Sequence, residues 1–355
     1  MEVEPPVVTI GPVENFAALA PIWRALERRT AGSFFQSWAW TGCLAEERFA
    51  EPWLLTARRD GKVVGLALFN RGPRKRLSID RPILLGESGV AQTDTLFIEH
   101  NGLLLDPAEG DDLERQCWAA LDEQFGRAKW LVSGVAEMAS TALPDGRATK
   151  ILARRPAPYL DLPAIPADSG MLDLMSANTR QQLRRSLRAW EEVGPLTLDV
   201  AATHEEADLF LDRLADLHQR YWTGRGKAGA FAEPFFGRFH HALLKRPSDG
   251  QSVDLIHVSA GERTVGYLYN FVQDGWVAAY QSGFDFGPDA DRLRPGMICH
   301  LLAIEHYRQA GMRRYDFLGG DARYKRSFAN AEIELLWLEI RRTLPWASAR
   351  RKRPE

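Results

Sequence analysis

Hydrophobic and polar positions divide the chain into two similar series of elements. In the first, Trp53–Phe69 contains two apolar strands around Asp60-Gly61, a dipeptide typical of tight hairpin turns. About two hundred residues later, Val253–Phe271 repeats this pattern around a second turn, and Val64-Gly65 is matched by Val265-Gly266. Each segment predicts a pair of antiparallel strands. Two ordinary hairpins that agree by coincidence remain the alternative to an internal repeat.

The residues after each hairpin also agree in order. A strand, a helix with apolar residues at helical spacing, a second strand and a closing strand are predicted at 95–105, 113–125, 130–132 and 149–162, and again at 276–284, 296–310, 315–318 and 333–341. Because a helix connects them, the strand after it is expected to pair parallel to the strand before it.

This order predicts an α+β fold of two tandem domains, each a mixed, mainly antiparallel twisted sheet flanked by helices. Prolines at 156, 158, 163 and 166 mark the boundary region between the halves. We therefore expect domains at 1–165 and 166–345, followed by a basic tail at 346–355. The tail is expected to be solvated, although its four consecutive basic residues leave a peripheral membrane contact open.

Composition narrows the class of protein. The 355 residues are 45% hydrophobic and 26% charged, typical of a soluble globular protein, and the net charge of −2 gives no general attraction to nucleic acid. No apolar run is long enough to span a bilayer, and the acidic start lacks the apolar segment of a signal peptide. Three separated cysteines indicate core positions in a reducing compartment. We expect a cytoplasmic protein, without a metal because the histidines lack ligand spacing.

The segment from Tyr280 to Phe328 carries the candidate chemistry. A basic, glycine-bearing turn leads into the helix at 296–310, and a helix N-terminus attracts anions through its free N–H groups and dipole. We expect this turn to bind a phosphate-bearing donor through Arg292, Arg294, Gly296 and Met297. Such a donor would lie next to the polar loop at 319–325.

Five short motifs carry a family resemblance: Asn178-Thr-Arg180, Arg184-Arg185, Arg294-Pro-Gly296, Asp316-Phe-Leu-Gly-Gly-Asp321 and Tyr324-Lys325. With the order of elements, they make the chain resemble the CelD/BcsL-type acetyltransferase family of the GNAT superfamily. The chain is more distantly similar to the FemABX aminoacyltransferases. The resemblance implies tandem GNAT-like domains, acetyl-CoA or another acyl-CoA as co-substrate, and acyl transfer to nitrogen or oxygen of a sugar or a cell-envelope or exopolysaccharide precursor.

One position departs from the superfamily pattern. GNAT domains usually carry [QR]-x-x-G-x-[GA] in this turn, but Pro295 stands where the first glycine is expected and offers no N–H. The two arginines can replace the lost donor through bidentate contacts. The equivalent turn of the first half, at 105–112, is acidic and would repel phosphate. We therefore assign donor binding to the second domain, with the first as a scaffold or acceptor wall.

Direct acyl transfer needs a base for the acceptor and an acid for the departing thiolate. We expect Asp321 as the base, Tyr324 as the acid, and Lys325 as the group that stabilises an oxyanion or a phosphate. No serine or cysteine lies in a nucleophile motif, so attack is expected within a ternary complex.

Four residues are candidates for substrate binding, each with a structural alternative. Arg180 and Arg184 lie on one face of the helix that Ser176 opens, and would bind an anionic group or form a solvated face paired with Glu191 and Glu192. Tyr280 would contact the acceptor or pack in the core. Asp316 would orient an amine or Lys325, or cap the neighbouring turn.

Two other functions remain open. A FemABX-like aminoacyl transfer from aminoacyl-tRNA would require a basic groove, which the net charge of −2 disfavours, so no nucleic acid is expected. A catalytically degenerate GNAT-like fold that only binds a precursor is the non-enzymatic alternative, and the altered turn at Pro295 favours it.

Overall fold

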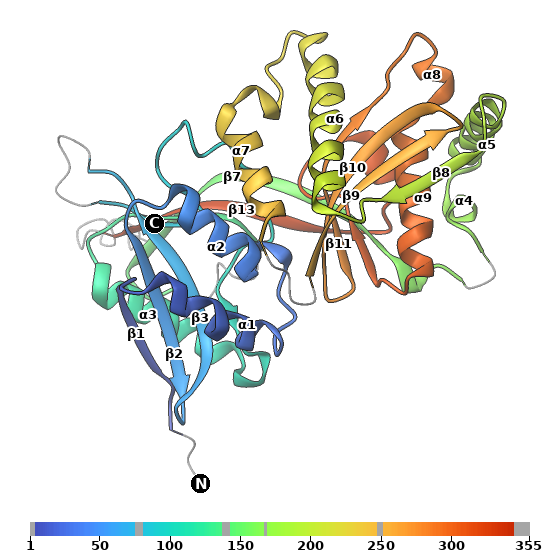
Figure 1. The fold of residues 1–355 in the computed structure, drawn as a ribbon. Helices are drawn as coiled ribbons and strands as arrows, with labels where there is room; N and C mark the ends of the chain where they lie inside the picture. Colours follow the sequence, from blue (N-terminus) through green and yellow to red (C-terminus); the bar gives the residue numbers. More distant parts are fainter. Residues whose placement is uncertain (1–3, 75–80, 137–142, 167–168, 247–250, 344–355) are drawn as a thin grey trace, which may run out of the picture. The chain divides into compact units, whose positions relative to one another are not determined.

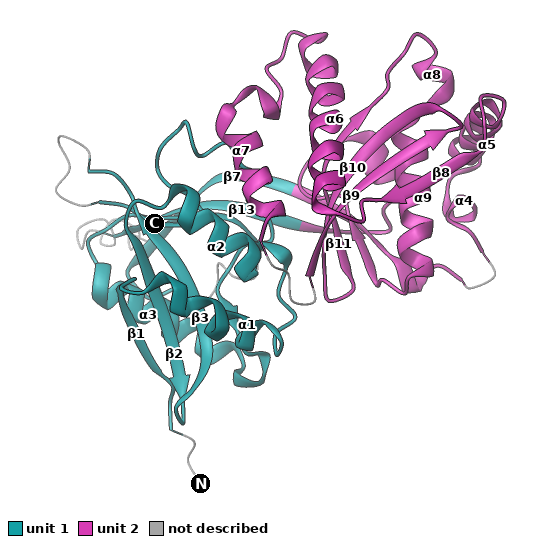
Figure 2. Ribbon diagram, in the orientation of Figure 1, with its two compact units in different colours: residues 1–155, 334–355 teal, residues 156–333 magenta. Residues whose placement is uncertain are grey.

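The computed structural model describes residues 4–74, 81–136, 143–166, 169–246 and 251–343 (Figure 1). The chain divides into two compact units, which Figure 2 colours separately. Unit 1 comprises residues 1–155 and 334–355, and unit 2 comprises residues 156–333. The basic tail at 346–355 lies outside the described residues.

Unit 1 is built on a mixed sheet with strand order β1-β2-β3-β4-β6-β13, in which β5 pairs with β3. Only β4 and β6 pair parallel among these neighbours. Its elements are β1 (Val7–Pro12), α1 (Leu19–Glu27), α2 (Trp38–Arg48), β2 (Pro52–Arg59), β3 (Lys62–Arg71), β4 (Ile83–Leu85), β5 (Leu104–Leu105), α3 (Asp111–Phe125), β6 (Trp130–Ala136), most of β7 (Arg147–Asp161) and most of β13 (Ala331–Arg342). Short 3₁₀ helices cover Phe16–Ala18, Phe34–Gln36 and Pro107–Glu109.

Unit 2 repeats this plan with the strand order β12-β11-β10-β9-β8, and the end of β7 pairs with β12. Here β11 and β12 form the parallel pair. Its elements are α4 (Met171–Leu174), α5 (Ala177–Glu191), β8 (Leu196–Val200), α6 (His204–Thr223), α7 (Pro234–Leu244), β9 (Gln251–Ala260), β10 (Arg263–Gln273), β11 (Trp276–Phe284), α8 (Ala290–Leu293), α9 (Pro295–Gln309), β12 (Arg314–Asp316) and α10 (Arg323–Phe328), with 3₁₀ turns at Leu162–Ala164 and Ala230–Ala232. The predicted fold class, mainly antiparallel sheet flanked by helices, is confirmed.

The two hairpins form where the sequence predicts them. In β2–β3 the turn residues Asp60 and Gly61 have φ of 50° and 76°, the left-handed pair that matches the twist of the strands. The corresponding hairpin β9–β10 turns at Gly261, with φ of 57°. Asp274-Gly275 makes the same left-handed pair between β10 and β11.

The repeat extends to one packing contact in each unit. A Cβ atom on Gly65 of β3 would lie 3.8 Å from the sulfur of Cys117 on α3. A Cβ atom on Gly266 of β10 would lie 3.2 Å from the sulfur of Cys299 on α9. Both crossover helices therefore approach their sheets at a glycine. The predicted core positions of Cys43, Cys117 and Cys299 are confirmed, since all three are buried.

The predicted strand at 95–105 is wrong except at its last two residues, which form β5. Its place in the sheet is taken by β4, which pairs with β3 and β6. The buried guanidinium of Arg48 holds the chain after β4 in an irregular path, because it donates to the Thr93 carbonyl at 2.8 Å and contacts Asp94 at 3.2 Å. A buried charge that gathers turn residues around it leaves no room for an extended ladder there.

The closing strands of the two halves are exchanged between the units' sheets. Residues Tyr159–Asp161, at the end of β7, pair with β12 of unit 2. Residues 335–340 of β13 pair antiparallel with β6 of unit 1, although they follow unit 2 in the sequence. Each half of the sequence thus supplies one strand to the other half's sheet.

Helices cover both faces of the unit 2 sheet (Figure 1). Along β10, Gly266 and Asn270 face α9, where they meet Cys299 and Tyr307. Tyr267, between them, faces α6 and packs on Phe210. This alternation is that of a strand buried on both faces. No helix among the described ranges combines the length and apolar character needed to cross a bilayer.

Candidate functional site

The parallel strands β11 and β12 separate beyond their first three residue pairs. They pair from Trp276 and Arg314 to Ala278 and Asp316, where β12 ends, whereas β11 continues to Phe284 along β10. Between Ala279 and Phe284 the edge of β11 that faces away from β10 therefore has no neighbouring strand among the described residues. We call this stretch the open edge of β11.

Two main-chain N–H groups point out of this open edge. The Asp285 N–H donates to Val265 O of β10 at 3.0 Å. In an antiparallel ladder the main-chain N–H and C=O groups of every second residue point to the same neighbouring strand, so those of Gly283 and Gln281 also point to β10. Ser282 and Phe284 are the alternate residues, which direct their N–H and C=O groups outward. His218 of α6 bonds Ser282 O at 3.1 Å and the Phe286 N–H donates to Phe284 O at 3.0 Å. The two N–H groups have no partner among the described residues.

The corresponding place in unit 1 is filled by the chain itself. Asn101 donates through Nδ2 to Leu85 O of β4 at 3.2 Å and to Ser133 O of β6 at 3.1 Å, and its N–H donates to Gly134 O at 2.9 Å. Gly134, at φ 67°, makes this approach possible, because a Cβ atom there would lie 2.0 Å from Ile98 O. The segment around Asn101 thus occupies the gap between β4 and β6, in an irregular conformation with φ of 45° at His100.

The donor turn expected from the sequence lies at the end of this open edge. Arg294, at φ 47°, is the N-cap of α9, Pro295 is its first residue, and a Cβ atom on Gly296 would lie 2.9 Å from the Phe284 ring. The N–H of Met297 already donates to Arg294 O at 3.0 Å. Of the first three helical residues, only Gly296 keeps an N–H without a partner among the described residues, so the turn depends on its arginines for further anion contacts.

The arginines around this turn are at or near the surface. Arg292 is exposed and lies 3.9 Å from Glu192, and Arg294 is half-buried with no ion pair to any described residue. Helix α5 packs directly on the turn, because the Ser186 hydroxyl donates to Arg292 O at 2.7 Å and the Trp190 indole donates to Leu293 O at 2.9 Å.

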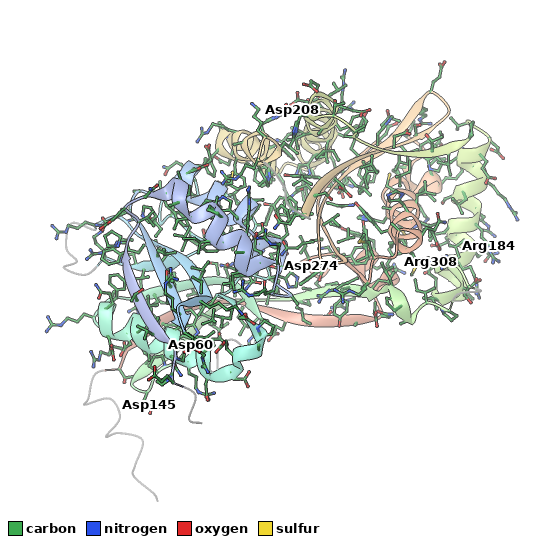
Figure 3. All side chains as sticks on the ribbon, turned by 60° about the horizontal axis from the view of Figure 1, so that its bottom comes forward. Asp60, Asp145, Arg184, Asp208, Asp274 and Arg308 are labelled. Atoms are coloured by element: carbon green, nitrogen blue, oxygen red, sulfur yellow. The ribbon has the colours of Figure 1, made fainter. Side chains whose placement is uncertain are left out.

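On α5, the predicted cap is confirmed: Ser176 Oγ accepts from the Thr179 N–H at 3.3 Å. Arg180 and Arg184 lie 4.0 and 3.9 Å from Asp173 of α4. Arg184 is at the surface in Figure 3. The pair is therefore a solvated cationic face that shares one carboxylate, at a contact too long and too exposed to hold it rigidly.

Tyr324, on α10, is half-buried and packs on α9, the helix that follows the donor turn. Its ring stacks on His300 of α9 with centroids 5.3 Å apart and planes 19° apart. Desolvation, with the nearby Tyr221 hydroxyl, raises the pKa of Tyr324 to about 12. The phenol therefore stays protonated throughout the physiological range and is available as a hydrogen-bond or proton donor.

Lys325 holds the loop after β12 rather than pointing freely into solvent. Its Nζ donates to the carbonyl oxygens of Leu318 and Gly319, both at 3.0 Å. Leu318 has φ of 59°, a strained value for a leucine, and its N–H donates to Asp316 Oδ1 at 2.7 Å. Asp316 is fully buried and also binds the Arg314 guanidinium. Lys325 and Asp316 together fix this strained loop.

Asp321 and Tyr280 lie in opposite environments. Asp321 is exposed, and its carboxylate contacts Arg326 at 2.5 Å. Tyr280 is 6% exposed and packs among rings on the α7 side of the sheet, including Phe271 at 4.7 Å and His240 at 5.0 Å between centroids. The structure brings Tyr324, Lys325 and Asp321 together on one loop and helix, and places Tyr280 in an aromatic core.

His300 is the site residue that sequence reasoning missed. It is 3% exposed, and its Nδ1 lies 3.0 Å from the Tyr315 hydroxyl. Burial, with the nearby Lys325 charge, lowers the pKa of His300 to about 3, so the imidazole is neutral. A histidine within an apolar helical stripe gives no local signal. Its four-residue spacing from Gly296, on the same face of α9, is the one indication in the sequence.

Among the described residues, no group of three histidine, cysteine or acidic side chains has a metal-binding arrangement. The candidate site brings together main-chain donors, arginines, a protonated tyrosine and a neutral histidine. Such a set can bind a phosphate-bearing group and polarise or protonate a bound atom.

Comparison with known proteins defines the class of the fold. The acetyltransferase (GNAT) domain family matches residues 177–326, which lie within unit 2 and include the open edge, the donor turn and the first four residues of α10. Residues 177–326 therefore carry the sequence pattern of a GNAT-type acetyltransferase domain. No curated protein matches the chain.

Solved structures extend the likeness to both units. The chain is similar to FemX, with a TM-score of 0.60 and 10% identity over 97% of this chain and 99% of that one. It is also similar to the C-terminal domain (DUF2156) of a protein named as a lysylphosphatidylglycerol synthetase from Agrobacterium fabrum, with a TM-score of 0.54 and 13% identity over 95% of each chain. L-PGS from Bacillus licheniformis is similar with a TM-score of 0.52 and 12% identity, over 92% of this chain and 93% of that one. At these identities the likeness shows a shared fold along nearly the whole chain.

Proposed function

We propose that unit 2 is an acyltransferase that moves an acyl group, acetyl from acetyl-CoA in the first instance, onto nitrogen or oxygen of a small acceptor. One observation carries this proposal: the open edge of β11 runs from two outward N–H groups to the N-terminus of α9, with a protonated Tyr324 beside it. A strand edge, an anion site and an acid in this order suit an extended donor that ends in a phosphate.

Unit 1 indicates what kind of chain fits such an opening. There the gap between the parallel strands is filled by a peptide segment whose Asn101 side-chain amide bonds both of them. The pantetheine arm of CoA also carries amide groups, whose carbonyl oxygens can accept from the N–H groups of Ser282 and Phe284. With its own gap filled, unit 1 serves in this proposal as a scaffold without a donor site.

The donor's phosphates would meet the turn before α9. The Gly296 N–H offers one main-chain donor, and Arg292 and Arg294 offer bidentate contacts that replace the donor missing at Pro295. Met297 borders the same turn and would pack against the carrier. Arg180 and Arg184 on α5 extend the cationic surface beside this turn, where a negatively charged part of either substrate would be held.

The chemistry proposed for the site is direct attack. The acceptor nitrogen or oxygen attacks the thioester carbonyl carbon and gives up its proton to the Asp321 carboxylate. The C–S bond breaks with its electrons on sulfur, and Tyr324 transfers its phenolic proton to the thiolate. The products are an amide or ester and a free thiol, and the phenolate and carboxyl group return to their initial states through solvent. Lys325 keeps the loop that carries both residues in place.

The family that the sequence resembles directs the choice of acceptor. We propose a sugar or a cell-envelope or exopolysaccharide precursor, acylated in the cytoplasm where CoA thioesters are available. Tyr280 and Asp316 are buried, so they would shape the site from behind the sheet and the loop rather than touch the acceptor.

A screen of CoA thioesters by thermal shift tests the donor. A ligand that binds the folded state at 100 times its Kd stabilises it by about 2.7 kcal/mol, enough to raise Tm measurably. Acetyl-CoA is expected to raise Tm, and longer thioesters report the acyl length. The aminoacyl transfer suggested by the names of the structural neighbours is the second candidate. If no thioester binds, aminoacyl transfer becomes the favoured function, because Pro295 leaves the turn only one main-chain donor for a pyrophosphate.

Kinetics then test the assigned residues. Tyr324→Phe and Asp321→Asn are each expected to lower kcat by about 10²–10⁴-fold, because each removes one proton transfer. Circular dichroism and the Kd for acetyl-CoA should remain those of the wild type. Unchanged turnover in both variants would remove these two roles while leaving donor binding intact.

A further inference from the structure

The histidine behind Tyr324 packs where β11 and β12 separate. Its ring centroid lies 6.0 Å from that of Phe284, at the end of β11, and 5.5 Å from that of Phe317, just after β12. His300 therefore contacts a side chain from each side of the separating strands. It also follows Gly296 by one helical turn, so it lies directly behind the donor turn.

The buried hydrogen bonds around His300 favour one nitrogen of its ring as the site of the proton. Asn270 Oδ1 is buried without a partner among the described residues, so Asn270 bonds its neighbours through Nδ2. Nδ2 donates to the Tyr307 hydroxyl at 3.3 Å, and the interaction of Asn270 with Tyr315 opposes the rise in the pKa of that tyrosine, as a donor near its oxygen would. The Tyr315 hydrogen is then free to point at His300 Nδ1.

With Nδ1 as the acceptor at 3.0 Å, the neutral imidazole must carry its hydrogen on Nε2. His300 Nε2 is buried and has no hydrogen-bond partner among the described residues. Burial at 3% exposure with an unmet N–H is a costly state, which a bound acceptor would relieve. Tyr315, Phe317 and Phe328 around the ring are buried, whereas Phe284 and Tyr324 are partly exposed, so a ligand would reach Nε2 by displacing one of these two rings.

We infer that the His300 Nε2–H donates a hydrogen bond to the carbonyl oxygen of the donor's acyl group. The inference rests on the proposed function and adds a catalytic residue to it. When the acceptor attacks, the carbonyl π electrons move onto oxygen, and the Nε2–H stabilises this negative charge without giving up its proton. A neutral imidazole suits this task, because it remains a donor without becoming an acid. The oxyanion then reforms the carbonyl as the C–S bond breaks.

Two ligands that differ only in the acyl group give the most direct test. In uniformly ¹⁵N-labelled full-length protein, the His300 signals are expected to show a protonated Nε2 before any ligand is added. Acetyl-CoA, which supplies a carbonyl, is expected to move the Nε2–H proton resonance downfield, whereas CoA, which binds the same turn without a carbonyl, should leave it in place.

The outcomes separate the inference from the proposed function. If both ligands perturb the Gly296 amide but the His300 Nε2–H responds to them equally, the inference is wrong and donor binding stands. A proton found on Nδ1, or an Nε2–H already bonded to a fixed water in both complexes, also overturns it. If neither ligand perturbs any resonance, the proposed function fails and this inference fails with it.

Variants supply an independent readout. His300→Phe keeps an aromatic ring against Tyr324 but removes the donor, and is expected to lower kcat by about 100-fold with little change in KM for acetyl-CoA. Tyr315→Phe leaves His300 in place but removes the hydroxyl that favours a proton on Nε2. Both tautomers then become populated, so a smaller loss in kcat is expected. A merely structural role predicts instead that His300→Phe raises KM and leaves kcat unchanged, and that result would contradict the inference.

Discussion

At the scale of single residues, the site depends on groups whose protonation is fixed by burial. Desolvation raises the pKa of Tyr324 to about 12 and, with the Lys325 charge, lowers that of His300 to about 3. Each shift keeps its group neutral, so the aromatic corner behind the donor turn carries no net charge of its own. The positive charge for anion binding comes from the arginines at the surface.

The lowered pKa of His300 predicts loss of stability in acid. The unfolded chain binds a proton at the ordinary pKa of 6.5, whereas the folded protein binds it only near 3. This contribution to the free energy of unfolding is therefore complete above pH 6.5 and is lost as pH falls toward 3, to an extent of roughly 3–5 kcal/mol. Denaturant titrations of His300→Phe should show a flatter pH dependence over this range.

The control for this effect is on the same helix. His306 is exposed, so His306→Phe should leave the slope of the wild type unchanged. His218 and His240 also have lowered pKa values through burial, so the slope of His300→Phe should decrease without vanishing. An identical slope in wild type and His300→Phe would show that His300 is not the buried neutral group described.

At the scale of elements, the two pairs of parallel strands use the same geometry differently. In unit 2 no described strand lies along the edge of β11 beyond Ala278, and in unit 1 the segment before β5 fills the equivalent gap. The filled gap depends on two glycines with positive φ, Gly86 and Gly134, where a Cβ atom would lie 2.7 Å from Asn101 Nδ2 and 2.0 Å from Ile98 O. These glycines indicate a packed, permanent contact.

Gly134→Ala is therefore expected to destabilise unit 1 strongly. The added Cβ atom would collide with the Ile98 carbonyl, in addition to the strain of a φ of 67°. A loss of at least about 3 kcal/mol in the free energy of unfolding is expected, as for other severe core strain. Gly146→Ala is the matched control, because its φ is 79° but its Cβ atom would meet nothing within 4 Å. Equal losses in the two variants would show that the segment does not pack on Gly134.

At the scale of the whole molecule, local patterns predicted the elements but not their partners. Asp60-Gly61 fixed one hairpin because only a left-handed turn suits that pair, and the donor turn followed from a proline and a glycine before an apolar helix. The path around Arg48 could not be predicted, because it depends on a buried charge whose partners lie more than forty residues away. The role of His300 depends on Tyr315 and Tyr324, which are distant in sequence.

The exchange of closing strands is also invisible in the sequence. An apolar strand such as β13 carries no local sign of which sheet it joins. Leu338→Ala in β13, where the side chain is 2% exposed in the unit 1 core, should cost about 2–5 kcal/mol. Hydrogen exchange should then accelerate in β3 and β6 of unit 1. Ile304→Ala on α9 is the counterpart, with acceleration expected in β10 and β11. If Leu338→Ala instead accelerated hydrogen exchange in β10 and β11, the assignment of β13 to the sheet of unit 1 would be wrong.

The central claim is that the turn before α9 binds an acyl-CoA, and calorimetric titration with acetyl-CoA tests it most directly. The wild type is expected to bind one equivalent. Arg294→Gly, which keeps the left-handed φ of 47° but removes the guanidinium, should weaken binding by at least about tenfold. Arg185→Ala is the control, because it removes an exposed arginine of α5. It should bind acetyl-CoA as the wild type does. No heat at millimolar acetyl-CoA, or equal affinities in all three proteins, would contradict the account.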